Sequence, residues 1–105
     1  MTLKDRVKTI LEHSVGEKYA LTQHTIAHYL KEDPRAIRLA IRELIKEGLP
    51  IASGNYGYFI VSSHEEARIY QERVKSMLIE DAKRIRDFKR AAGNYLAPAK
   101  QERLL

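Results

Sequence analysis

Residues 31–48 read KEDPRAIRLAIRELIKEG and carry the sharpest local signals in the chain. Asp33 is a residue type that favours the N-cap of a helix. Pro34 suits the first helical position because its missing N–H group would have no partner there. Gly48 is the residue type expected immediately after a helix ends. The segment therefore predicts a helix over residues 34–47.

The predicted helix has one apolar face and one basic face. Aliphatic residues recur at helical spacing, which predicts that their side chains pack into a core. Basic residues are interleaved with them and are expected to face away from that core. The expected inward residues are Ile37, Ile41, Leu44 and Ile45, and the expected outward residues are Arg35, Arg38, Arg42 and Lys46.

Two further helices are expected before this one. Thr2 followed by Asp5 forms a capping-box pattern and predicts a helix over residues 3–13. Thr22 predicts the start of a second, shorter helix. Residues 19–21 between them predict a short extended link, which is a candidate third strand for a later hairpin.

A β-hairpin is expected after the basic helix. Residues 51–53 and 58–61 have the composition of short strands, and a turn rich in Gly and Asn joins them. The predicted fold is therefore mainly α with a small β-hairpin wing. This is the element order of a winged helix-turn-helix domain, here over residues 1–61.

A long C-terminal helix is expected over residues 62–93. Ser63 and the acids that follow it predict a helix start near residue 64, and Gly93 with Asn94 predicts its end. At about 1.5 Å per residue, a helix from about His64 to Ala92 would be roughly 43 Å long, which exceeds what a small domain can cover. Residues 94–105 are expected to form a flexible tail.

Three segments resemble the winged helix-turn-helix domain of the biotin-operon repressor type. They are AIRLAIREL at residues 36–44, GLPI at residues 48–51 and GYFI at residues 57–60. The match spans about residues 5–61 and does not reach the repressor's ligase domain, so biotin chemistry is not implied. Small phage and mobile-element DNA-binding proteins, in which one long helix follows the wing, offer a looser resemblance.

Both the resemblance and the residue pattern predict a DNA-binding surface. An α-helix fits the major groove, and arginine can grip guanine or a phosphate with two parallel hydrogen bonds. Small polar residues at a helix N-terminus commonly bind a phosphate, and the wing is expected near the backbone or minor groove. The expected DNA-binding residues are Arg35, Arg38, Leu39, Arg42 and Lys46 on the basic helix, Thr22 and Gln23 before it, and Asn55 and Tyr56 on the wing.

The long helix carries an apolar stripe that extends beyond the first domain. Its near half is expected to pack against the first helix, and its far half predicts a homodimer or a contact with a protein partner. The basic residues between 83 and 90 form either a second DNA contact or a solvated helix face. The expected oligomerisation residues are Val74, Leu78, Ile85 and Phe88.

Composition narrows the functional classes. There are 19 Lys and Arg residues against 14 Asp and Glu residues, so the chain has a formal charge of +5 that favours a polyanionic partner. Cysteine is absent, which excludes disulfides and thiolate chemistry. His24 and His28 have the spacing of two zinc ligands but lack a third, so no metal and no cofactor are expected. No catalytic motif stands out.

The longest purely apolar run has four residues, Tyr58 to Val61, so no membrane span is expected. The first residues contain no apolar segment typical of a secretory signal, so secretion is not expected either. The sequence therefore predicts a cytoplasmic, non-enzymatic protein that binds double-stranded DNA. It would act as a transcriptional regulator or as a replication or packaging accessory. The alternative is a protein-protein interaction module within a larger, phage-type assembly.

Overall fold

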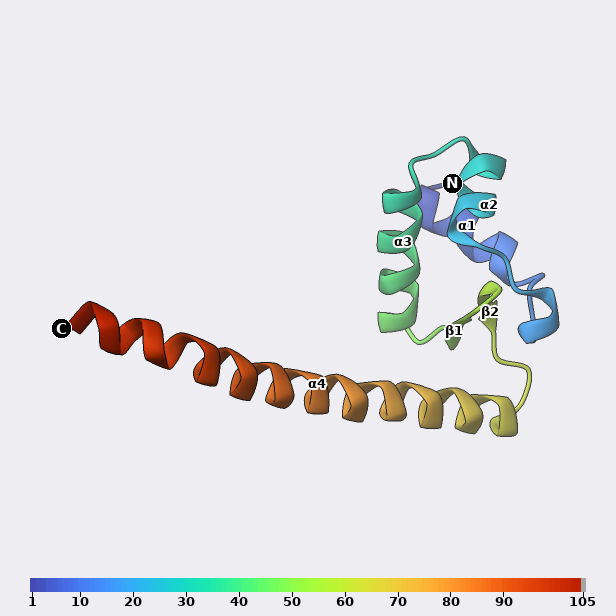
Figure 1. Cartoon of the computed structure of the whole chain (residues 1–105). Helices are drawn as coiled ribbons and strands as arrows, with labels where there is room; N and C mark the ends of the chain where they lie inside the picture. The colour runs from blue at the N-terminus through green and yellow to red at the C-terminus, as the bar shows by residue number, and fades with distance from the viewer. Residues whose placement is uncertain (105) are drawn as a thin grey trace. The chain divides into compact units, whose positions relative to one another are not determined.

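The computed structural model describes residues 1–104, with side chains up to residue 97. The chain divides after Tyr70 into two compact units, which are described separately. It is mostly helical, with one small antiparallel hairpin and a long C-terminal helix, as predicted (Figure 1). The elements are α1 (Leu3–Leu11), the 3₁₀ turn η1 (Glu17–Tyr19), α2 (Gln23–Leu30), α3 (Pro34–Lys46), β1 (Ile51–Gly54), β2 (Gly57–Ile60) and α4 (His64–Leu104).

The helix starts predicted from the sequence are confirmed. Thr2 and Asp5 form a reciprocal capping box at α1, and the Thr22 hydroxyl accepts a hydrogen bond from the main-chain N–H of Thr25 at α2. The Asp33 carboxylate accepts one from the main-chain N–H of Arg35 at α3 (2.8 Å). Each cap pairs a main-chain donor that the first helical turn leaves without a partner.

The core of the first unit lies where α3 packs against α1 and α2 (Figure 1). Ile37, Ile41 and Leu44 of α3 are buried there, as predicted. Ile45 was expected on the same face, and this prediction is wrong because 46% of its surface is exposed. Ala40 takes the remaining buried position on α3. The buried arc therefore ends between Ile41 and Ile45.

The hairpin pairs β1 with β2 in antiparallel register, from Ile51 opposite Ile60 to Gly54 opposite Gly57. The expected third strand is reduced to a single antiparallel bridge, in which Leu21 and Tyr58 exchange main-chain hydrogen bonds of 2.7 and 2.9 Å. The preceding link does not extend further because residues 17–19 form η1. The bridge nevertheless fixes the hairpin to the segment that leads into α2.

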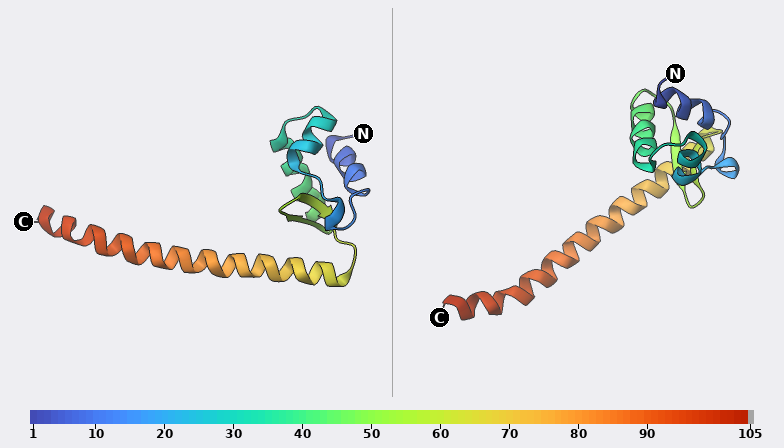
Figure 2. Two further views of the ribbon diagram at one scale, coloured as in Figure 1. Left: turned by 45° about the vertical axis from the view of Figure 1, so that its right-hand side comes forward. Right: turned by 90° about the horizontal axis from the view of Figure 1, so that it is seen from above.

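Ser63 precedes helix α4 and caps it, because its hydroxyl accepts a hydrogen bond from the main-chain N–H of Glu66 (3.1 Å). The predicted end at Gly93 and Asn94 is wrong, because the helix continues to Leu104 as one ribbon (Figures 1 and 2). A glycine inside a helix costs only about 1 kcal/mol relative to alanine, and the two alanines before Gly93, together with Leu96 and Ala97 after it, favour the helix. Among the helices that the structure describes, none is both long enough and apolar enough to cross a membrane.

Candidate nucleic-acid interface

The outer face of α3 presents the basic residues expected from the sequence. Arg35, Arg38, Arg42 and Lys46 are all exposed, and Leu39 is exposed beside them. At about 100° per residue these five side chains fall within roughly 100° of arc around the helix axis. They therefore form one stripe along about three turns of α3, on the side away from its buried residues. We call these five residues the α3 stripe.

The three guanidinium groups of the α3 stripe make no side-chain hydrogen bond or ion pair with any residue that the structure describes. Elsewhere in the first unit, arginines are engaged. Arg6 donates to the main-chain carbonyl of Leu30 and lies 3.8 Å from the Glu32 carboxylate, and Arg68 pairs with Glu65. The positive charge of the α3 stripe is thus uncompensated, which is the electrostatic condition for binding an anion.

Residues at the start of α2 support α3. The Gln23 side-chain amide donates a hydrogen bond to the main-chain carbonyl of Pro34 (2.8 Å). The Thr22 hydroxyl caps α2 and also donates to the Thr25 hydroxyl (2.8 Å). Both residues were predicted to contact phosphate. The structure places them beside the start of α3 and assigns their side chains to intramolecular bonds.

The tip of the hairpin is formed by Asn55 and Tyr56, and both side chains are exposed. Tyr56 borders a shallow hollow together with Lys18 from η1. Lys18 could not be predicted as a neighbour of the wing, because no local sequence pattern connects η1 with a turn almost 40 residues later. The wing lacks basic residues of its own, and both Lys18 and Glu17 line the hollow beside it.

Ile45 is a second residue that the sequence analysis missed. Its exposed side chain lies at the edge of the α3 stripe, about 20° around the helix from Arg38. An exposed aliphatic side chain at this edge can contact an apolar group such as a thymine methyl, as was expected of Leu39.

The residues predicted to form an oligomer lie on α4, away from the α3 stripe in the sequence. Leu78, Ile85 and Phe88 are exposed, and Val74 is half-buried. The basic residues of this helix between 83 and 90 are exposed as well. Three of them are paired within the helix: Lys83 with Glu80, Arg84 with Asp81 and Arg86 with Asp87.

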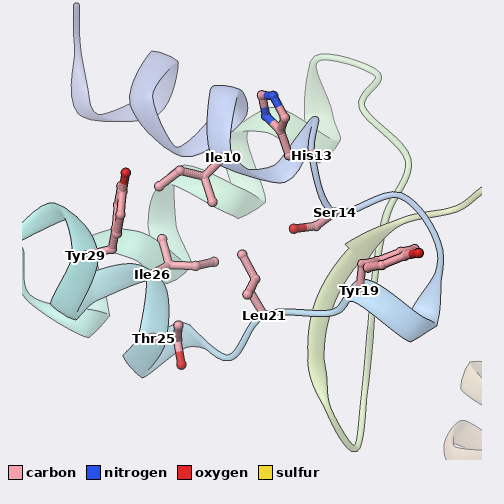
Figure 3. Close-up of a pocket in the computed structure, with 8 residues that line it drawn as sticks. All are labelled: Ile10, His13, Ser14, Tyr19, Leu21, Thr25, Ile26 and Tyr29. Carbon is pink, nitrogen blue, oxygen red and sulfur yellow. The ribbon is translucent and has the colours of Figure 1, made fainter.

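A hollow of about 480 Å³ opens between α1, α2 and the link before α2. Figure 3 shows the Ser14 hydroxyl pointing into it, toward Ile10, Leu21 and Ile26. Ser14 is only 3% exposed. The hollow is mostly apolar and contains none of the α3 arginines.

Within residues 1–97, His, Asp and Glu side chains do not gather in any group of three that could hold a metal ion. His24 and His28 are exposed. Comparisons with protein families, with curated proteins and with solved structures gave no match.

Proposed function

We propose that the chain binds double-stranded DNA by placing α3 in the major groove. The observation that carries this proposal is the α3 stripe, where three guanidinium groups without intramolecular partners share one exposed helix face. Two of them, Arg38 and Arg42, lie one turn apart and can reach successive positions along the groove. Because these guanidinium groups are not paired with carboxylates of the chain, DNA can bind them without first displacing such a partner.

The surroundings of α3 fit this role. Gln23 fixes the N-terminal end of the helix through Pro34. The burial of Ile37, Ile41 and Leu44 fixes its rotation about its axis. A rigid support of this kind lets a few side chains meet base edges in a defined register. The proposed base contacts are Arg35, Arg38, Leu39 and Arg42, with Lys46 at a phosphate.

The proposed biological role is occupancy of a DNA site without a chemical reaction, as in a transcriptional regulator or a replication or packaging accessory. The resemblance of residues 5–61 to the biotin-operon repressor type of winged domain supports this proposal. The alternative, a protein interaction module, is favoured by one observation: α4 exposes the aliphatic and aromatic side chains of Leu78, Ile85 and Phe88.

Fluorescence anisotropy with a labelled random duplex of about 25 base pairs tests the proposal, because phosphate contacts make binding weaken steeply as salt rises. On a duplex selected by the parent chain, we expect Arg38→Ala and Arg42→Ala each to weaken specific binding by about 1–3 kcal/mol without changing Tm. Lys8→Ala, which removes an exposed charge from α1, is the matched control and is expected to bind nearly as the parent does.

Two results would overturn the proposal. Unchanged affinity in both arginine variants, at unchanged Tm, would exclude α3 as the contact surface. Failure of the parent chain to bind any duplex at low salt would exclude DNA binding and favour the interaction module.

A further inference from the structure

Helix α4 carries an apolar stripe whose larger side chains are mostly exposed. Leu78, Ile85 and Phe88 are 65%, 65% and 72% exposed, and Leu96 is exposed too. At about 100° per residue these side chains fall within roughly 80° of arc, together with Val74 and Ala92. An apolar stripe of this length on a charged helix is typical of a surface that binds another helix. We call the six residues the α4 stripe.

One acidic residue interrupts the α4 stripe near its middle. Asp81 falls at the same angular position as Val74 and Phe88, to within about 20°. Its carboxylate lies 3.7 Å from the guanidinium of Arg84, one turn further along the helix. If two copies of α4 paired in parallel and in register, Asp81 of each copy would face Asp81 of the other across an apolar contact. Two carboxylates in such a position repel each other and lose hydration.

The charges of α4 are separated along its length. Residues 65–81 contain five acidic and three basic side chains, whereas residues 83–90 contain five basic and one acidic. A parallel pair would place the two basic segments side by side. An antiparallel pair places the acidic segment of each copy toward the basic segment of the other, which lowers the electrostatic energy.

We propose that α4 pairs with α4 of a second copy of the chain in antiparallel orientation, with the two-fold axis near Ala82. In this register Leu78 lies opposite the second copy's Ile85, and Val74 lies near the second copy's Phe88. At about 1.5 Å per residue, Asp81 lies about 1.5 Å along the axis from the second copy's Arg84 and about 3 Å from the second copy's Asp81, so guanidinium groups of both copies flank the two carboxylates. The two α4 stripes then cover each other between Val74 and Phe88.

Light scattering or sedimentation of the full chain tests self-association. The sample contains no DNA, so the outcome is independent of the proposed DNA binding. We expect a dimer whose fraction rises with concentration between about 1 and 100 µM. Ile85→Asp is expected to abolish it. Ile79→Asp is the matched control, because Ile79 is also an exposed isoleucine of α4 (50%) but points away from the α4 stripe. Circular dichroism will test whether both variants remain helical.

The absence of cysteine allows the orientation to be measured with one introduced thiol and a spin label. At about 1.5 Å per residue, an antiparallel pair centred on residue 82 separates labels on Glu72→Cys by about 30 Å along the axis and labels on Asn94→Cys by about 36 Å. Labels on Ala82→Cys remain close together. A parallel pair gives one short separation, near the interaxial distance of about 10 Å plus the label lengths, at all three sites.

Three results would overturn the proposal. The mass of one chain, 12.2 kDa, at every concentration would exclude self-association. Equal short distances at all three labels would exclude the antiparallel orientation. A dimer that survives Ile85→Asp but is lost in Ile79→Asp would place the contact on the opposite face of α4.

Discussion

The side-chain amide of Gln23, the first residue of α2, donates a hydrogen bond to the main-chain carbonyl of Pro34, the first residue of α3, over 2.8 Å. This bond links the starts of the two consecutive helices across the tight turn between them. The carbonyl of Pro34 also belongs to the first turn of α3, so the bond restrains the end of α3 that precedes Arg35 and Arg38. Gln23 is therefore a positioning residue for the α3 stripe.

We expect Gln23→Ala to lower the free energy of unfolding by about 0.5–1.5 kcal/mol, because it removes a half-buried hydrogen bond. If Gln23 positions α3, DNA affinity falls by more than the loss of one phosphate contact would cause, and discrimination between sites falls with it. Urea unfolding and anisotropy measure the two effects. His24→Ala, at the exposed neighbouring position, is the control. If Gln23→Ala and His24→Ala had equal free energies of unfolding and equal DNA affinities, the bond would contribute to neither stability nor DNA binding.

Arg38→Lys separates base recognition from simple charge. Lysine keeps the positive charge but lacks the planar fork that makes two parallel hydrogen bonds with guanine. On a duplex selected by the parent chain, we expect Arg38→Lys to lose about 1 kcal/mol or more, whereas binding to random duplex stays nearly constant. Equal losses on both duplexes would mean that Arg38 contacts a phosphate only.

Two isoleucines on α3 provide a matched test of its buried face. Ile41 is 1% exposed and Ile45 is 46% exposed, although both were expected to be buried. We expect Ile41→Ala to lower the free energy of unfolding by about 2–5 kcal/mol and Ile45→Ala to change it by about 0.5 kcal/mol or less. Urea denaturation measures both. Similar losses in the two variants would contradict the observed rotation of α3.

The elements of the first unit were predictable because their signals are local. Each of the first three helices begins after a capping residue whose side chain accepts a hydrogen bond from a main-chain N–H group two or three residues later. These capping residues are Thr2, Thr22 and Asp33. The hairpin was predictable for the same reason, since its turn residues adjoin both strands. The outward direction of the α3 arginines followed from helical periodicity.

What the sequence did not reveal depends on contacts between distant segments or on balanced preferences. Ile45 lies only about 40° around α3 from Ile41, so periodicity alone cannot say on which side of the border the core ends. Gly93 is a weak helix breaker among strong helix formers, and these outweigh it. The Gln23 bond to Pro34 and the approach of Lys18 to Tyr56 require the folded chain to be seen.

Gly57 and Gly48 both have positive φ, at 114° and 108°, but their surroundings differ. A Cβ atom on Gly57 would lie 2.3 Å from the main-chain oxygen of Leu21, whereas one on Gly48 would meet nothing within 4 Å. We expect Gly48→Ala to cost about 1–3 kcal/mol from backbone strain alone. Gly57→Ala is expected to cost more, because it also breaks the bridge between Leu21 and Tyr58. Equal costs by urea denaturation would show that the bridge contributes nothing.

Glu66 connects the first turn of α4 to η1 and makes this junction sensitive to acid. Its carboxylate accepts hydrogen bonds from the main-chain N–H groups of Ser62 (2.6 Å) and Glu17 (3.1 Å), and from the Ser62 hydroxyl. The main-chain bonds, first from Ser62 and then from Glu17, hold the pKa of Glu66 below its ordinary value of 4.5, because they favour the charged form.

A carboxylate whose pKa is lower in the folded state than in the unfolded state stabilises the fold once it is ionised. The contribution of Glu66 is therefore complete above pH 4.5, and it is lost as the pH falls from there through the lowered pKa. We expect Tm to fall over this acidic range in the parent chain. Glu66→Gln is expected to have a lower Tm at neutral pH and a smaller further loss in acid, because the amide does not titrate. Parallel Tm curves for the two proteins between neutral and acidic pH would exclude Glu66 as the source of this acid sensitivity.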